Sequence, residues 1–242
     1  MSTHKKAFSL IELSIVLIVI GVLVGGIVAG NSMIKAAKIQ SVVSDFAKYK
    51  KAAEDFKYKY SFWPGDMPNA YDYWATDASC ANSAAPTGCN GNGDGLVTGG
   101  YESLRGWQFL KITGFISGYY SGTQGGLTSY VPGTNIPVSS YNNPVGTYGI
   151  YTTKNSYDYY NATFSSVSRF AISLFAPLSG TNGVDGAMRP VDAKAIDRKI
   201  DDSLAATGYL IGANYGSTCL SAGEYDTANN SSRLCALSYQ IE

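Results

Sequence analysis

The feature that most constrains this chain is an apolar run near its N-terminus, FSLIELSIVLIVIGVLVGGIVAG, which extends from Phe8 to Gly30. It contains a single charged side chain, Glu12. About 20 apolar residues in a helix are enough to cross the hydrocarbon core of a bilayer, whereas a secretory signal peptide has an apolar core of only about 7–15 residues. The run therefore predicts a membrane-spanning helix.

Two basic residues, Lys5 and Lys6, stand just before this run. Positive charge next to a membrane helix stays on the cytoplasmic side. We therefore expect the N-terminus to be cytoplasmic and the rest of the chain to lie outside the cytoplasm.

Glu12 breaks the apolar pattern, and an ionised carboxylate within a membrane costs a few kcal/mol on insertion scales. One interpretation is that Glu12 sits near the interface and reaches water. The other is that it is a functional group with a partner, and a new N-terminal amine at Phe8 would be a suitable one.

The segment KKAFSLIELSIVLIVIGVLVGG resembles the class III leader and membrane helix of type IV pilins and of the pseudopilins of type II secretion. The resemblance implies that a prepilin peptidase cuts between Ala7 and Phe8, that the amine of Phe8 is methylated, and that Glu12 becomes the fifth residue of the mature protein. Ala7 departs from the family, which usually has Gly before the cut.

The resemblance also implies an assembly mechanism. The protein would wait in the bacterial inner membrane with its head in the periplasm, and an inner-membrane platform would assemble it into a helical filament with copies of itself or related pilins. The amine of Phe8, on the same or a neighbouring subunit, would supply the counter-charge for Glu12. A buried carboxylate needs such a partner or it becomes protonated.

Apolar residues continue past the membrane run on one helical face, at Ile39, Val42, Val43, Phe46, Tyr49, Ala53, Phe56 and Tyr60. The sequence Trp63-Pro64-Gly65-Asp66 is a strong stop signal. We therefore predict one helix over 8–60. The predicted organisation is a leader (1–7), a membrane or filament-core helix (8–30), its amphipathic continuation (31–60) and a globular head (61–242).

The head has strand-like runs at 148–152, 170–175, 208–212 and 234–239, separated by turn residues that favour an antiparallel sheet. Two short helices are expected, at 102–116 and 191–200. The stretch 117–147 is rich in Gly, Ser, Tyr, Asn and Pro and is predicted to be surface loop. The expected fold class is α+β, with a long N-terminal helix packed on an antiparallel sheet, as in pilins.

All four cysteines lie in the head: Cys80, Cys89, Cys219 and Cys235. An even number in an exported domain indicates disulfides, for which three connectivities exist. We favour the local pairs, Cys80 with Cys89 and Cys219 with Cys235, because each closes a short loop. The second loop resembles the C-terminal disulfide-bounded loop of many pilins.

The segment Asn90-Gly-Asn-Gly-Asp-Gly begins like a calcium-binding EF-hand loop. It departs from that pattern because the twelfth position is Tyr101 and Glu102 comes one residue too late. Several pseudopilins bind calcium in the head. We weigh a calcium site, with ligands Asn90, Asn92, Asp94 and Glu102, against a metal-free Asn-Gly turn, and we expect no other cofactor.

Further head segments, WPGDMPNA, CNGNGDG, ESLRGWQFL and AIDRKIDD, resemble motifs in a widespread group of proteobacterial prepilin-type proteins. The acidic residues Asp192, Asp197, Asp201 and Asp202 alternate with basic ones and predict a solvated helix and turn, with a second ion site as the alternative.

Composition narrows the function. The formal net charge is zero and the one histidine, His4, is beside the N-terminus. Neutrality argues against non-specific nucleic-acid binding, and the absence of further histidines argues against histidine catalysis in the head. We expect the protein to be a structural subunit of a type IV pilus or a pilus-like filament, and not an enzyme. The alternatives are a pseudopilin of type II secretion and a membrane-tethered binding or enzymatic head.

Overall fold

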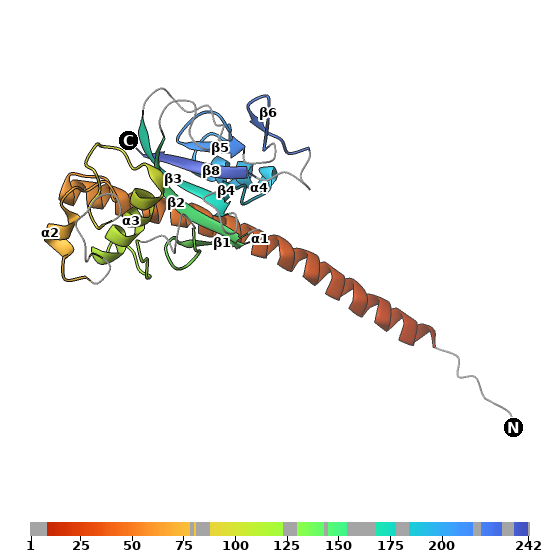
Figure 1. Cartoon of the computed structure of the whole chain (residues 1–242). Coiled ribbons are helices and arrows are strands. Elements are labelled where there is room, and N and C mark those ends of the chain that lie inside the picture. The colour runs from red at the N-terminus through yellow and green to blue at the C-terminus, as the bar shows by residue number, and fades with distance from the viewer. Residues whose placement is uncertain are drawn as a thin grey trace. The chain divides into compact units, whose positions relative to one another are not determined.

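The computed structural model describes residues 9–77, 80, 88–122, 130–142, 145–153, 168–177, 184–214, 219–228 and 235–241. The chain divides into two compact units, of which the first ends at Lys38 and the second begins at Ile39. Figure 1 shows the helices α1 (Leu10–Tyr60), α2 (Ala70–Trp74), α3 (Gly99–Ile112) and α4 (Pro190–Ile200). The strands are β1 (Val138–Asn142), β2 (Val145–Thr153), β3 (Arg169–Pro177), β4 (Val184–Asp185), β5 (Leu210–Asn214), β6 (Leu220–Ser221), β7 (Glu224–Tyr225) and β8 (Cys235–Ile241).

Helix α1 is continuous over 51 residues, which confirms the predicted long helix. No proline interrupts it, so every turn can keep its backbone hydrogen bonds. It ends where Ser61 takes a left-handed backbone with φ of 63°. Its buried residues are all in the second unit and repeat at helical spacing: Ile39, Val42, Phe46, Tyr49, Ala52, Ala53 and Phe56.

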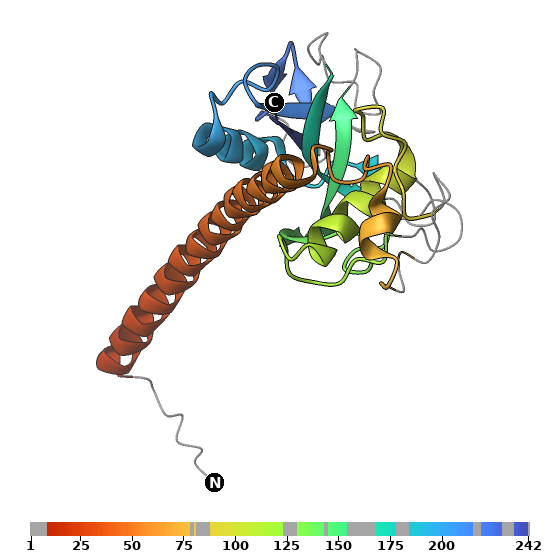
Figure 2. The ribbon, with the colours of Figure 1, turned by 90° about the vertical axis from the view of Figure 1, so that its left-hand side faces the viewer.

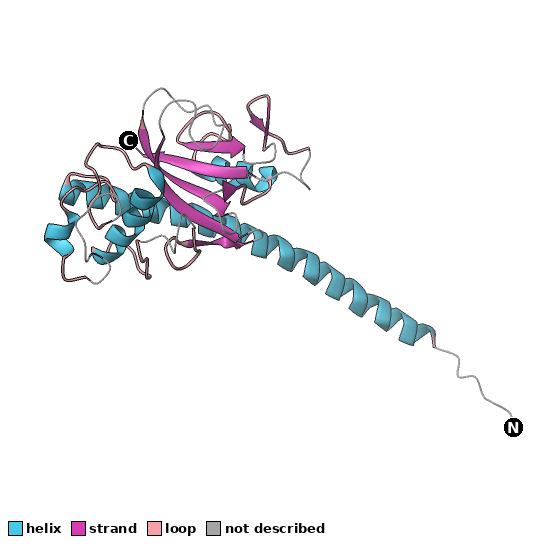
Figure 3. Ribbon diagram, viewed as in Figure 1, coloured by secondary structure: helices cyan, strands magenta, loops and turns pink. Residues whose placement is uncertain are grey.

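The main sheet of the second unit has the order β1-β2-β3-β8-β5, every neighbouring pair is antiparallel, and β4 adds to β3 (Figure 3). Strand β3 is central, with Ile172 opposite Ile150 of β2 and Tyr239 of β8. The buried Ser173 of β3 lies opposite Ser238 of β8, and its hydroxyl donates to the hydroxyl of Ser238 at 2.9 Å. The four predicted strand-like runs therefore become β2, β3, β5 and β8.

Aromatic side chains join the second half of α1 to the sheet. Phe46 contacts Tyr148 of β2 edge-on, with ring centroids 5.6 Å apart, and Tyr239 of β8 at 5.8 Å. Tyr49 lies 4.9 Å from Trp107 of α3, also edge-on. Such pairs stabilise a core beyond the area that they bury. Figure 2 shows α4 next to α1, where Lys199 donates to Gln40 at 3.2 Å.

Two predicted boundaries were wrong. Helix α3 begins at Gly99 and ends at Ile112, not at 102 and 116. At its start, tertiary contacts override the low helix propensity of the first two glycines. At its end, Gly114 has a left-handed backbone with φ of 77°, which terminates the helix. The stretch 117–147 is not only loop. It contains β1, a short polar strand without an apolar pattern, which pairs with β2.

Candidate functional site

The first candidate site is the exposed part of α1. Its large apolar side chains from Leu10 to Ile34 are all at least half exposed. Among the described residues, α1 is the one helix that is long and apolar enough to cross a membrane. Apolar surface of this extent is unfavourable in water and needs lipid or other apolar helices around it.

Four glycines interrupt this apolar segment, at Gly21, Gly25, Gly26 and Gly30. A Cβ atom added at any of them would meet nothing within 4 Å. The chain's own fold therefore does not require glycine there. If a small residue is needed at these positions, the reason is a close approach by another helix or flexibility of α1 itself.

The start of α1 is a capping box, in which the side chains of Ser9 and Glu12 accept hydrogen bonds from backbone N–H groups that have no partner within the helix. The backbone N–H of Ser9 donates to Glu12 Oε2 at 2.9 Å, and Ser9 Oγ accepts from the N–H of Ile11 at 3.3 Å. The Ser-x-x-Glu spacing before an apolar run is a sequence signal for this motif that we missed. Glu12 thus also has a local structural role, and its charge lies in the first turn, where the helix dipole favours it.

Ala7 and Phe8 lie outside the described residues. The cleavage between them, the methylation of Phe8 and its pairing with Glu12 therefore stay predictions.

The second candidate site is in the head, where a loop lies against the turn that follows α1. The N–H of Gly91 donates to the carbonyl of Met67 at 2.8 Å, and that of Gly93 to the carbonyl of Asp66 at 2.9 Å. A Cβ atom at Gly91 would be 2.4 Å from the backbone of Asp66. Only glycine permits this approach, so the loop and the turn are built to fit each other.

The first turns of α3 also lie against the turn that follows α1. A Cβ atom at Gly65 would be 2.2 Å from the carbonyl oxygen of Glu102, and one at Gly106 would be 2.8 Å from that of Pro64. Three of the four head motifs of the sequence, WPGD, NGNGDG and ESLRGW, therefore meet at one place in the structure.

Of the four predicted calcium ligands, the structure gathers three. Glu102 Oε1 accepts from the N–H of Asn92 at 3.3 Å, and Asn92 Nδ2 donates to Asp94 Oδ2 at 3.2 Å. Asn90 Oδ1 is instead engaged by the N–H of Tyr71, at 2.7 Å, at the start of α2.

Asp66 belongs to the same site, although the sequence analysis did not include it. Its Oδ2 accepts from the N–H of Gly95 at 3.0 Å. Its Oδ1 is buried and has no hydrogen-bond partner among the residues that the structure describes, while Asp66 as a whole is only 1% exposed.

The electrostatics of this site are those of crowded carboxylates. Burial raises the pKa of Asp66 to about 6, against the backbone hydrogen bond from Gly95, and the charge of Asp94 raises it further. Burial also raises the pKa of Glu102, and both Asp66 and Asp94 add to that shift. In the absence of a cation, burial therefore disfavours the ionised forms of both Asp66 and Glu102.

The acidic residues at the end of α4 form a separate cluster. Among the described residues, Asp197, Asp201 and Asp202 are the one set of three or more metal-ligand side chains whose ligand atoms lie within 4.8 Å of one another. Their oxygens already accept hydrogen bonds: Asp197 from Tyr225 at 2.8 Å, Asp201 from the N–H of Leu210 at 3.2 Å, and Asp202 from the hydroxyl of Thr207 at 2.6 Å. The bonds to Asp201 and Asp202 hold the chain between α4 and β5, and the bond to Asp197 joins α4 to β7.

Asp192 is not part of that cluster. It forms an ion pair with Arg189 at 3.1 Å and accepts from the hydroxyl of Tyr141 at 2.6 Å. It therefore ties α4 to β1.

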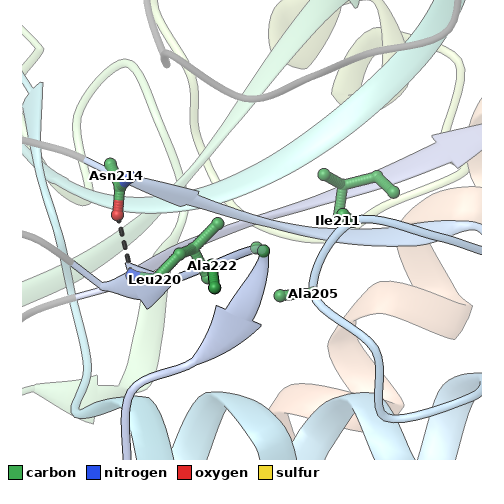
Figure 4. A pocket seen from close by; sticks show the side chains of 8 residues that line it. Ala205, Ile211, Asn214, Leu220 and Ala222 are labelled. Carbon is green, nitrogen blue, oxygen red and sulfur yellow. Dashed lines mark hydrogen bonds between the residues drawn. The ribbon is translucent and has the colours of Figure 1, made fainter.

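The two disulfides join Cys80 to Cys89 and Cys219 to Cys235. The second closes a loop that carries the β6–β7 hairpin. A pocket of about 230 Å³ lies between this hairpin and β5, and Figure 4 shows Asn214 Oδ1 accepting from the N–H of Leu220 at 2.9 Å at its side. The residues that line the pocket carry no titratable side chain: Ala205, Ala206, Ile211, Gly212, Asn214, Leu220, Ala222 and Gly223.

A long, exposed apolar helix with a carboxylate in its first turn, followed by an α+β head, defines a protein with a pilin-like architecture. Residues 2–28 match the family model of the prokaryotic N-terminal methylation motif, so the chain carries the signal motif of type IV pilins and pseudopilins. No curated protein and no solved structure matches the chain. The motif implies processing by prepilin peptidase and assembly into pilin-type filaments, and its family is structural rather than enzymatic.

Proposed function

We propose that this protein is a structural subunit of a type IV pilus. The observation that carries the proposal is the methylation motif on an apolar helix segment that its own chain leaves uncovered. In the membrane, lipid covers this segment. In the filament, the same segments of neighbouring subunits cover one another, so one surface serves both states.

The proposed location follows from the flanking charges and the cysteines. Lys5 and Lys6 hold the leader in the cytoplasm, and the head lies in the periplasm until assembly. Two disulfides in the head support this orientation, because disulfides persist in oxidising compartments and are rare in the cytosol.

A pseudopilin of a type II secretion system is the alternative. The disulfide-bounded loop close to the C-terminus, with its β6–β7 hairpin, favours a pilus subunit because it resembles the loop of many pilins. A tethered enzymatic head has less support, since the family of the methylation motif is structural rather than enzymatic.

A deletion strain separates these functions. Loss of surface filaments in electron micrographs, with normal protein secretion, would support the pilus. Accumulation of exported proteins in the periplasm, with surface filaments unchanged, would support the pseudopilin. If neither changes while the protein stays in the membrane fraction, the filament proposal is wrong.

A further inference from the structure

We propose that the head binds a calcium ion at Asp66, Asp94 and Glu102, between the turn after α1, the loop 90–97 and the first turn of α3. This inference does not rest on the proposed function, because the assembly helix and the cation site share no residue.

The first argument is the unpartnered oxygen of Asp66. A buried polar atom without a hydrogen bond costs about 1–3 kcal/mol, and a carboxylate oxygen costs more. Asp66 Oδ1 is such an atom, and the same carboxylate is fixed through Oδ2 by the N–H of Gly95 at 3.0 Å. A bound cation would give Oδ1 the partner that no described residue supplies.

The second argument is the concentration of charge around one loop. Asn92 Nδ2 donates to Asp94 Oδ2 at 3.2 Å, and the N–H of Asn92 donates to Glu102 Oε1 at 3.3 Å. The N–H of Gly95, next to Asp94, donates to Asp66 Oδ2 at 3.0 Å. One short loop therefore joins three carboxylates, and a divalent cation would turn their mutual repulsion into attraction.

The third argument concerns which cation fits. The available donors are carboxylate and amide oxygens, which hard cations prefer, and calcium accepts irregular sets of six to eight oxygens where magnesium demands near-octahedral geometry. The three carboxylates do not all lie within 4.8 Å of one another, so at least one must move to share an ion. Asp94 is the one that can, because it is exposed and lies between Gly93 and Gly95, with φ of 73° and 84°.

The Asp197, Asp201 and Asp202 cluster is the matched comparison. It is more compact, but, in contrast to Asp66 Oδ1, none of its buried side-chain oxygens lacks a hydrogen-bond partner among the described residues. An Asp202→Asn variant therefore serves as a control that removes a carboxylate without touching the proposed site.

The test uses the full-length protein in detergent micelles, freed of metal with EDTA and then titrated with CaCl₂. For the wild type we expect the melting temperature to rise by roughly 5–10 °C when calcium is about 100 times its Kd. Asp66→Asn should lose this rise, and Asp202→Asn should keep it. Without calcium, Asp66→Asn should be at least as stable as the wild type, since it removes a buried charge near two other carboxylates.

Several results would overturn the proposal. One is a wild type that does not respond to calcium. Another is a rise that survives in Asp66→Asn or disappears in Asp202→Asn, and a third is an equal rise with magnesium at the same concentration. If Asp66→Asn does not fold, Asp94→Asn is decisive, because Asp94 is exposed: its calcium affinity should fall at least about tenfold, and an unchanged affinity would contradict the site.

Discussion

The hydroxyl of Tyr148 donates a hydrogen bond to Asp45 Oδ2 across 3.0 Å. Tyr148 is fully buried on β2, whereas Asp45 lies half-buried on α1 among apolar neighbours. Burial raises the pKa of Asp45, and the hydrogen bond from Tyr148 and the charge of Lys48 oppose that shift. This contact is a polar link between the helix and the sheet within a largely aromatic interface.

Replacing Tyr148 by Phe should therefore destabilise the head by about 1–3 kcal/mol. The ring would keep its packing on Phe46, but the carboxylate of Asp45 would lose a donor. Urea unfolding, followed by tryptophan fluorescence, measures this change. Tyr58→Phe on the same helix is the control, because Tyr58 is 94% exposed and its hydroxyl can bond to water. Equal stability of the two variants would contradict the role of the Tyr148 bond.

The pH dependence of stability should report on Asp66. Its pKa of about 6 in the folded protein exceeds the ordinary value of 3.8, so the folded state holds this proton more tightly than the unfolded state. The stability that protonation contributes is therefore present below about pH 4 and lost as the pH rises to about 6.

In EDTA, Asp66→Asn should gain stability relative to the wild type between pH 4 and pH 7, by roughly 1–3 kcal/mol. Urea unfolding at several pH values measures the difference between the two proteins. A difference that does not change with pH would show that burial and the neighbouring Asp94 do not hold the proton on Asp66.

Processing should depend on the residue before the predicted cut. Ala7→Gly restores the residue that the pilin family usually has there, so we expect cleavage at least as fast as in the wild type. Pulse-chase labelling with electrophoresis separates precursor from mature protein. A bulky control, Ala7→Leu, should slow cleavage, and unchanged rates in both variants would argue against a cut between Ala7 and Phe8.

Glu12 has two candidate roles, and two variants separate them. Glu12→Ala removes both the cap on the N–H of Ser9 and the negative charge, whereas Glu12→Gln keeps an acceptor for that N–H and removes only the charge. If the charge fixes the register of assembly, both variants should insert into the membrane and neither should form filaments. The sheared filament fraction, quantified by immunoblotting, measures this, with Ser14→Ala as the control.

Filaments from Glu12→Gln at the wild-type yield would show that the cap is sufficient. Wild-type yields from both Glu12 variants would remove the residue from the assembly mechanism.

The sequence predicted the parts of the fold that are governed by local patterns. Helix α1 was found because its apolar residues keep a helical spacing as far as Tyr60, and β3 because its buried residues form one apolar run. Strand β1 escaped because its sequence, VSSYN, has no such pattern and its pairing with β2 positions it.

The cation site was predicted only in part for a related reason. Asn92, Asp94 and Glu102 are close in sequence, and Asn92 and Asp94 follow the start of an EF-hand pattern. Asp66 is 29 residues from Gly95, and only the fit of glycine-rich segments brings it there. Asn90 illustrates the reverse error, since its place in the pattern does not reveal that its side chain accepts from Tyr71.

The central claim is that this chain is cleaved, methylated and assembled through α1. Mass spectrometry of the N-terminal peptide from sheared surface filaments tests it most directly. The account predicts a peptide that begins at Phe8 and is heavier by one methylene group than the unmodified sequence. Absence of the protein from the filaments, or its presence with the leader 1–7 still attached, would contradict the account.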